Sequence, residues 1–189
     1  CMTPETGLKE TALCMSDIVR QGKSLYVGMS NYDGKTMHRM HHKCHDFNVP
    51  FVVNQNRYNI LDRQIEKNDL KKECHDKHKG LVAFSPLAQG RLSDKFRHGV
   101  PEDYCKSIGL DDSQLEYIMA LYDISQSRDE TLSQMAIQWL LQKGVTSVLV
   151  GARNKTQLLE NLDALNKPPI SHDDMKRIDK YAKITKKNN

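Results

Sequence analysis

Four short apolar runs, separated by stretches with helical spacing, constrain the fold more than any other feature of the sequence. The runs are "SLYVGM" (24–29), "PFVVN" (50–54), "GLVAFS" (80–85) and "TSVLVG" (146–151). Each is nearly continuous in apolar and β-branched residues, which is typical of strands buried on both faces of a parallel sheet. The sequence therefore predicts four parallel strands.

Helical patterns fill the spaces between these runs and continue after the last one. The expected helices cover about 7–21, 34–47 and 69–79, then begin at Asp111, at Thr131, after the fourth run and at Ser171. Strands that alternate with helices form right-handed βαβ units, so the fold class is α/β with a parallel sheet. No low-complexity linker interrupts residues 1–189, which we expect to form a single unit. Residues 86–111 carry no clear element and are expected to form a long loop or lid.

Composition excludes several classes of partner. The chain has 189 residues, 38% of them hydrophobic and 28% charged, with a formal net charge of +4. This mild charge, without a basic stripe interleaved with aromatics, predicts no nucleic-acid partner. No apolar run approaches the roughly 20 residues that a membrane span needs. Five widely spaced cysteines without a C-x-x-C pair indicate reduced thiols and a cytoplasmic protein.

Four blocks of sequence carry a resemblance to a known family. The blocks are "GKSLYVGMSNYD" (22–33), "VVNQNRYNILDR" (52–63), "VAFSPLAQGRLSDKF" (82–96) and "VTSVLVGARNKTQLLENLDAL" (145–165). In this order and spacing the chain resembles the aldo-keto reductases, and most of all the bacterial branch related to potassium-channel β-subunits. The resemblance implies a TIM (β/α)8 barrel, of which this chain matches about the last four βα units, a half-barrel with a C-terminal helix.

The resemblance also implies a cofactor, NADPH or NADP, and contacts to its nicotinamide. Ser30 and Asn31 follow the first run and Gln55 follows the second, at the strand ends where barrel active sites form. A hydroxyl and two amides can bind a carboxamide through paired donors and acceptors, and in the family these positions hold the nicotinamide amide. Phe84 ends the third run, where the family places an aromatic ring beneath the nicotinamide.

The stretch "SPLAQGRLSDK" has the composition of a phosphate-binding corner. The resemblance places it over the cofactor pyrophosphate. Pro86 stiffens the corner, while small residues allow backbone N–H groups to approach an anion and cations supply charge. The residues assigned to this contact are Ser85, Pro86, Leu87, Ala88, Gly90, Arg91 and Lys95.

The stretch "GARNKTQLLEN" (151–161) opens a helix directly after the fourth run. A helix N-terminus attracts anions through its free N–H groups and its dipole. Gly151 and Ala152 permit close approach, and Arg153 is suited to the 2′-phosphate of NADPH because a guanidinium binds phosphate oxygens bidentately. Three further residues share one helix face, which the family uses for the adenosine end: Gln157, Glu160 and Asn161.

A histidine cluster offers a rival site. In "HRMHHKCH", His38, then His41 or His42, then His45 share a helix face at metal-ligand spacing. The apolar stripe of the same helix is expected to face the core, which places these histidines in water. We therefore assign no metal site.

Two classes of function remain open. In the first, the chain is the NADP(H)-binding portion of an aldo-keto reductase-type oxidoreductase that reduces aldehydes or ketones by hydride transfer. The family's catalytic Asp, Tyr, Lys and His belong to its first half, and no residue of this chain matches them, so none is assigned as catalytic. In the second, the chain is a non-catalytic binding or interaction module, or an inactive truncated product. Unpaired sheet edges predict self-association or pairing with an N-terminal half, which would complete the site for a carbonyl substrate.

Overall fold

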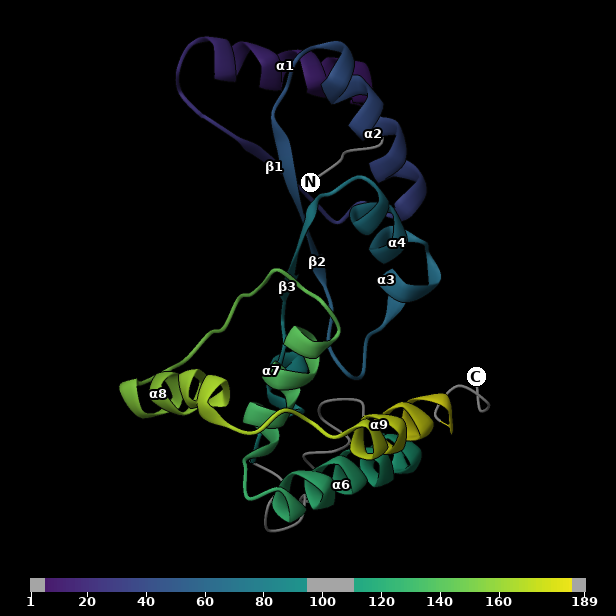
Figure 1. Cartoon of the computed structure of the whole chain (residues 1–189), viewed down its shortest axis with the longest axis vertical. Helices are drawn as coiled ribbons and strands as arrows, with labels where there is room; N and C mark the ends of the chain where they lie inside the picture. Colours follow the sequence, from purple (N-terminus) through teal and green to yellow (C-terminus); the bar gives the residue numbers. More distant parts are fainter. Residues whose placement is uncertain (1–5, 95–110, 185–189) are drawn as a thin grey trace. The chain divides into compact units, whose positions relative to one another are not determined.

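The fold is described by a computed structural model covering residues 6–94 and 111–184. These residues group into two compact units (Figure 1). Among the described residues, the first comprises 6–58, 63–84 and 144–149, and the second comprises 59–62, 85–94, 111–143 and 150–184. The expectation that residues 1–189 form one unit stays a prediction.

A four-stranded, wholly parallel sheet forms the frame of the first unit. Its strands are β1 (Val27–Ser30), β2 (Phe51–Arg57), β3 (Gly80–Phe84) and β4 (Ser147–Val148). They lie in the order β1-β2-β3-β4, so the sequence order is also the spatial order. This arrangement is what consecutive right-handed βα units produce, and it confirms the predicted α/β class.

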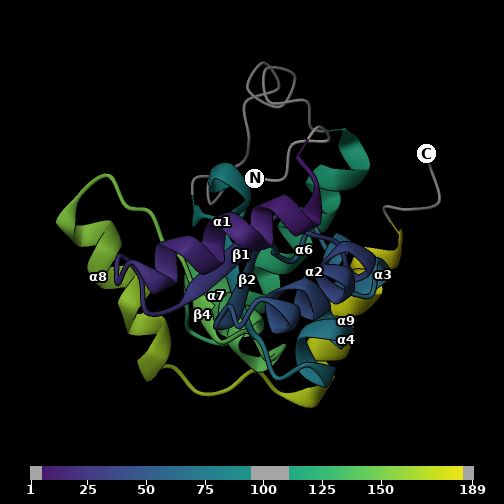
Figure 2. The same cartoon turned by 90° about the horizontal axis from the view of Figure 1, so that it is seen from above.

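Helices of the first unit are α1 (Leu8–Arg20), α2 (Gly34–Asp46), α3 (Gln64–Lys67) and α4 (Leu70–Asp76). Helix α2 packs against β2 and α4 against β3, while α1 lies beside α2 (Figures 1 and 2). The apolar stripe expected on α2 is buried, because Met37, Met40 and Cys44 are almost inaccessible to solvent. Helix α3 is a single turn that the periodicity did not predict.

Strand register assigns side chains to the two faces of this sheet. Met29 pairs with Asn54, which pairs with Leu81, and all three are buried on the side covered by α2 and α4. Because side chains alternate along a strand, the following residues point to the opposite face. Ser30 and Gln55, paired in register, lie on that second face and are only half-buried.

The strands differ from their predicted lengths. The second continues to Arg57, three residues past the predicted end at Asn54, and the third ends one residue early, at Phe84. The first starts at Val27 rather than Ser24, and its register to β2 is irregular between Val27 and Gly28. Apolar Leu25 and Tyr26 are left outside the strand, with 79% and 65% of their surfaces exposed. The fourth is two residues long, although backbone hydrogen bonds from Thr146 to Leu81 and from Leu149 to Ala83 continue the pairing beyond both ends. β-Branched composition alone does not set where a strand ends, because pairing partners also decide it.

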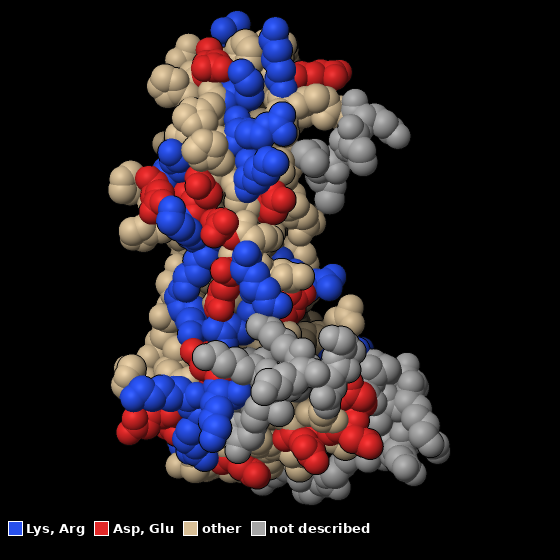
Figure 3. All heavy atoms as spheres, turned by 90° about the vertical axis from the view of Figure 1, so that its right-hand side faces the viewer, with Lys and Arg blue, Asp and Glu red and all other residues tan. Residues whose placement is uncertain are grey.

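Charged side chains cover the helical side of the first unit. Figure 3 shows Lys and Arg gathered over α2 and interleaved with Asp and Glu over α3 and α4. Three ion pairs join residues one turn apart, with N–O distances of 2.7–3.0 Å: Lys43–Asp46, Arg63–Glu66 and Lys72–Asp76. The two exposed pairs, Lys43–Asp46 and Lys72–Asp76, are of a kind that contributes little to stability.

The second unit is helical. It contains η1 (Ala88–Gly90), α6 (Asp112–Ser127), α7 (Leu132–Gln142), α8 (Lys155–Asp163), η3 (Ala164–Asn166) and α9 (His172–Ile184). Helix α7 packs against α6, α8 and η3, and α6 packs against α9. Its core is formed by the buried residues Ile118, Leu121, Leu132, Trp139, Leu140 and Ile178.

Helix starts in the second unit follow the predicted capping residues. Asp111 accepts a hydrogen bond from the Gln114 N–H, and Thr131 forms a reciprocal capping box with Gln134. Ser171 accepts from the Asp174 N–H ahead of α9. Among the helices of residues 6–94 and 111–184, none has both the length and the apolar character needed to cross a membrane.

Candidate functional site

The carboxyl ends of β1, β2 and β3 bring together three of the residues assigned to the nicotinamide. Ser30 lies opposite Gln55 in the β1–β2 pairing, and Gln55 lies opposite Val82 in the β2–β3 pairing. Phe84 is two residues beyond Val82, so it shares their face of the sheet. A hydroxyl, an amide and an aromatic ring, all half-buried, therefore occupy one face at the end of the strands where parallel α/β folds place their sites.

Asn31 follows directly in the loop after β1. Its φ is 61°, in the left-handed region that Asn tolerates better than most residues. Its backbone N–H donates to the Gln55 carbonyl over 2.9 Å, which continues the β1–β2 pairing by one residue, and its side chain is exposed. Asn31 therefore directly follows Ser30 at the end of β1, and its assignment to the nicotinamide stays a prediction.

Two asparagines of β2 hold this loop from the other face. The buried Asn56 side chain donates to the Tyr32 carbonyl over 3.1 Å, and Asn54 donates to the Asn56 side-chain oxygen over 3.2 Å. A buried amide is stable only with partners, so this pair fixes the backbone next to Asn31. Our sequence reasoning did not assign either residue. The signal available was "VVNQNR", in which two amides alternate with Gln55 in a buried strand.

Two residues of the loop after β1 have shifted pKa values. Asp33 caps α2 by accepting the Thr36 N–H over 2.7 Å, and this hydrogen bonding lowers the pKa of the Asp33 carboxyl. Burial raises the pKa of the Tyr32 phenol, which therefore stays neutral at physiological pH. The Asp33 carboxylate, the one negative charge of the loop, lies at the N-terminus of α2, where the helix dipole favours a negative charge.

In the second unit, Ser85 to Asp94 form a closed corner. Ser85, Ala88, Gln89 and Gly90 all have positive φ, and the Asn59 side chain donates to the Ser85 carbonyl over 2.9 Å. The N–H groups of Ala88 and Gly90 donate within the corner, to Ser85 and Leu87. The N–H groups of Ala88 and Gly90 are thus engaged within the corner, and the assigned pyrophosphate contact stays a prediction.

The same corner is anchored at its far end. Leu92 is fully buried, and the Asp94 carboxylate accepts the Leu132 N–H at the start of α7 over 2.9 Å. Pro86 is buried, while the side chains of Leu87 and Arg91 are half-buried. Lys95, and residues 95–110 of the predicted lid, lie outside the described residues.

Two side chains form hydrogen bonds with backbone N–H groups at the N-terminus of α8. Asn154 accepts the Gln157 N–H over 2.9 Å, and the Gln157 side chain accepts the Arg153 N–H over 2.9 Å. Gly151, Ala152 and Arg153 are exposed ahead of the helix. An anion could reach this end, where the Arg153 guanidinium is nearby.

Residues on the predicted adenosine face of α8 are in different environments. Gln157 is exposed and its side-chain oxygen takes part in the cap. Glu160 is half-buried, and Asn161 is only 6% exposed. The common face that the i, i+3, i+4 spacing predicted is therefore partly covered.

The histidines of α2 form an aromatic cluster. His38 bonds Glu73 of α4 over 2.9 Å, and its ring meets that of His42 edge to face with centroids 4.8 Å apart. His41 lies against His42 in the same way. Within the described part of the chain, no group of three His, Cys, Asp or Glu side chains could hold a metal ion.

The predicted site residues are divided between the units. Ser30, Asn31, Gln55 and Phe84 belong to the first, whereas the corner and the start of α8 belong to the second. Convergence of the two sets on one dinucleotide stays a prediction.

Comparison with known proteins defines the class. The sequence profile of the aldo/keto reductase family matches residues 1–183. The chain is 36% identical over 188 residues to an L-glyceraldehyde 3-phosphate reductase of Escherichia coli O157:H7, and 35% identical to the same enzyme of strain K12. In each case 93% of this chain matches 54% of the relative.

A solved structure gives the same result. A thermostable aldo-keto reductase, Tm1743, crystallised with the inhibitor epalrestat, superposes with a TM-score of 0.73 at 30% sequence identity. The match covers 95% of this chain and 56% of that one. The chain belongs to the aldo/keto reductase family, and it spans about half the length of the relatives it matches. Its four parallel βα units are those of a TIM-barrel fold.

Proposed function

We propose that this chain is the NADP(H)-binding portion of an oxidoreductase that reduces aldehydes or ketones. The observation that carries the proposal is the placement of Ser30, Gln55 and Phe84 on one sheet face at the carboxyl ends of adjacent parallel strands. Family membership makes that strand end the expected location of oxidoreductase chemistry.

The residues present fit a nicotinamide. Its carboxamide needs one donor and one acceptor, which the Gln55 amide offers on its own and the Ser30 hydroxyl can supplement. Phe84 offers an apolar surface for the ring on the same face. When bound, the cofactor supplies a hydride; the residues of this chain bind and orient it.

The second unit supplies the sites for the rest of the cofactor. The exposed Arg153 ahead of α8 would bind a 2′-phosphate, which favours NADP(H) over NAD(H). The Ser85 hydroxyl and the Arg91 side chain would bind the pyrophosphate. Both assignments extend the family resemblance to residues whose chemistry is suitable.

The substrate class follows from the relatives. Two of them are named as reductases of a phosphorylated aldehyde, so an aldehyde is the first substrate to test. No residue of this chain is assigned as the acid that protonates the carbonyl oxygen, so we expect reduction only when further βα units complete the site. The five cysteines without a C-x-x-C pair favour a cytoplasmic location.

The proposal includes association of this chain with further strands at the edge of its sheet. β1 is an edge strand, and the apolar side chains of Leu25 and Tyr26 just before it are exposed. An open edge of a parallel sheet favours the addition of further strands. We expect the purified chain to associate with itself or with a separate N-terminal half.

Fluorescence titration with 2′-phosphoadenosine tests the 2′-phosphate assignment separately from the rest. We expect this ligand to compete with NADPH in the wild type and to lose at least about tenfold in affinity when Arg153 becomes Ala, since charged hydrogen bonds to phosphate are strong. Equal affinity of the Arg153→Ala variant would contradict the assignment. The substitution Lys180→Ala, at an exposed position of α9, is the matched control.

The alternative, a half-barrel without catalytic function, makes a different prediction. It expects cofactor binding or partner binding without any carbonyl reduction in the completed assembly. NADPH oxidation with a reactive aldehyde, measured after mixing with an N-terminal half from a relative, separates the two functions.

A further inference from the structure

Helix α7 carries three glutamines at intervals of four residues. Gln134, Gln138 and Gln142 fall at i, i+4 and i+8, so they line one face of the helix. Gln134 and Gln138 are each only 5% exposed. A buried amide without partners destabilises a fold, so these side chains must have specific partners.

Each glutamine bonds the same neighbouring segment. Gln134 donates to the Glu160 carbonyl over 3.2 Å and to the Asp163 carboxylate over 3.1 Å. Gln138 donates to the carbonyls of Ala164 and Lys167 over 3.1 and 2.9 Å.

Gln142 completes the series. Its amide donates to the Ile170 carbonyl over 3.1 Å and accepts the Ile170 N–H over 2.8 Å. The three side chains thus hold residues 160–170 at three successive levels, about 6 Å apart at the rise of an α-helix. We call Gln134, Gln138 and Gln142 the glutamine ladder.

The ladder supplies hydrogen-bond donors to backbone carbonyls at the end of α8 and after it. The last carbonyls of a helix have no partner within it. Gln134 reaches one of them, at Glu160, and Gln138 reaches the carbonyls of η3 and of the link to α9. Because hydrogen bonds are directional, a shift of α8 along α7 would break the bonds of Gln134, and Gln138 and Gln142 hold the segment that follows α8.

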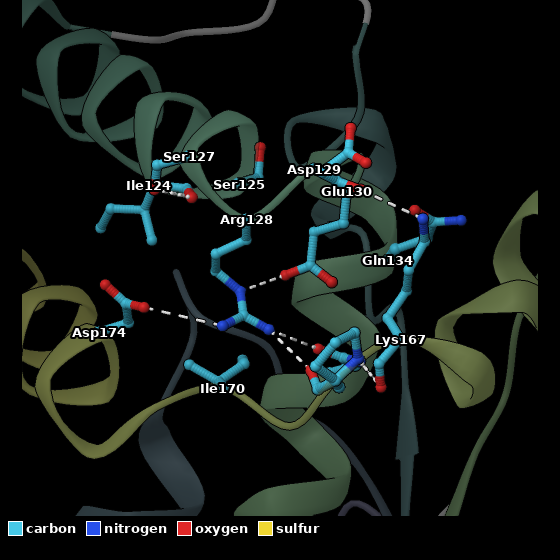
Figure 4. Close-up of polar contacts among 12 residues, drawn as sticks. Ile124, Ser125, Ser127, Arg128, Asp129, Glu130, Gln134, Lys167, Ile170 and Asp174 are labelled. Atoms are coloured by element: carbon cyan, nitrogen blue, oxygen red, sulfur yellow. Dashed lines mark hydrogen bonds and ion pairs between the residues drawn. The ribbon is translucent and has the colours of Figure 1, made fainter.

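Arg128 and Lys167 form further hydrogen bonds that hold the link between α8 and α9, and we call these bonds the brace (Figure 4). Arg128 bonds the buried Glu130 and donates to the Pro168 carbonyl over 2.8 Å. Lys167 donates to the Asp129 carbonyl over 3.1 Å. Arg128 also donates to the side-chain oxygen of Gln138 over 3.3 Å, so the ladder and this brace act on one segment.

We propose that the glutamine ladder positions the cofactor by fixing α8, whose N-terminus presents Arg153. This inference rests on the proposed function, because it assigns to α8 the 2′-phosphate of NADP(H). Gln134 bonds the backbone of Glu160, three residues after Gln157 and within the helix that the cofactor would contact. The glutamines are therefore positioning residues, and none of them touches the cofactor.

The test is a substitution of Gln138, the middle glutamine of the ladder. Gln138→Met keeps the size of the side chain and its helix propensity but removes the donor for two carbonyls. Two measurements are made on the whole chain: amide hydrogen exchange, and affinity for NADP⁺ and NAD⁺. We expect exchange across residues 157–166 to become at least about tenfold faster, since opening of α8 would require fewer bonds to break.

The cofactor measurement separates positioning from general destabilisation. We expect the Kd for NADP⁺ to rise about tenfold and that for NAD⁺ to change less than about twofold, because only the 2′-phosphate depends on Arg153. Gln21→Met is the matched control: Gln21 is exposed at the C-terminus of α1, in the first unit, and is not part of residues 160–170. It should leave both readouts unchanged.

Each outcome decides one question. Unchanged exchange in α8 overturns the ladder as a positioning device. Faster exchange with equal weakening of NADP⁺ and NAD⁺, or with no weakening of either, overturns its role toward the 2′-phosphate. If the wild type binds neither nucleotide, the proposed function fails and the cofactor role of the ladder fails with it, whereas the exchange result still decides whether the ladder holds α8.

Discussion

At the level of single residues, the amides of β2 serve opposite faces of one sheet. Gln55 lies on the half-buried face with Ser30, and Asn54 and Asn56 lie on the buried face, where they hold the Tyr32 carbonyl. Side-chain amides occur on both faces of the strand. Because side chains alternate between the faces, the amides have different roles.

The role of Gln55 can be tested by an apolar substitution of similar size. We expect Gln55→Met to raise the Kd for NADPH about tenfold, because a lost hydrogen bond of about 1.4 kcal/mol corresponds to that factor. NADPH fluorescence titration is the measurement. Gln64→Met, at the exposed first residue of α3, is the control and should bind normally; weakening by both variants alike would contradict a specific role for Gln55.

The cysteines differ in reactivity. Burial raises the pKa of the Cys44 and Cys74 thiols to about 11, whereas Cys14 is exposed. Only the thiolate reacts, so we expect iodoacetamide at pH 8 to modify Cys14 before Cys44 and Cys74, and those two only in denaturant. Peptide mass spectrometry measures the three rates, and equal rates in the native protein would contradict the burial.

The same pKa values predict how stability depends on pH. A thiol with a raised pKa in the folded state binds its proton more tightly there than in the unfolded chain. The contribution of Cys44 and Cys74 to stability is therefore complete below about pH 9 and is lost as the pH rises through about 11. We expect the urea midpoint to fall between pH 8 and pH 10.5, and to fall less in the double variant with Ala at both positions.

At the level of elements, the start of α2 depends on close contact with the α3–α4 link. The Gly34 N–H donates to the Asn68 carbonyl over 2.9 Å. A Cβ at Gly34 would lie 2.5 Å from that carbonyl oxygen and 2.6 Å from the Asp69 carbonyl carbon. Since both are backbone atoms, they cannot move aside without shifting the chain.

We expect Gly34→Ala to lower the free energy of unfolding by about 1–3 kcal/mol, the usual cost of overpacking. Gly7→Ala is the matched control, because a Cβ there would meet nothing within 4 Å and the change should stay within about 0.5 kcal/mol. Urea denaturation measures both. Equal stability of the two variants would show that the contact at Gly34 is relaxed in solution.

Elements were predictable from the sequence where a local signal defines them. Asp111, Thr131 and Ser171 cap helices as predicted, because a cap depends on a few consecutive residues. The ends of β1 and β4 differ because a strand's length depends on its partners. The glutamine ladder was visible as a spacing on α7, but spacing does not show which distant backbone a side chain will bond.

At the level of the whole molecule, the family and the class of fold could be predicted because four blocks occur in order over nearly the whole chain. The placement of Ser30, Gln55 and Phe84 also followed, since strand ends of parallel units meet at one edge of a sheet. The sequence did not predict that the N–H groups of Ala88 and Gly90 donate within the corner, because four residues with positive φ set the directions of these groups.

The open edge of the sheet makes association the expected state. We expect light scattering to give a mass at least twice that of the 21.7 kDa chain at micromolar concentration. Changing Leu25 and Tyr26 to Asp should shift the mass toward the monomer, because the exposed apolar surface beside β1 is removed. A monodisperse monomer for the unchanged chain would contradict this expectation.

The most direct test of the account is the fluorescence of NADPH on titration with the purified chain. We predict an enhanced, saturable signal below about 1 mM, with weaker binding of NADH, because the nicotinamide contacts are common to both and only NADPH carries the 2′-phosphate. Unchanged fluorescence of both nucleotides over that range would contradict the claim that this chain binds the cofactor.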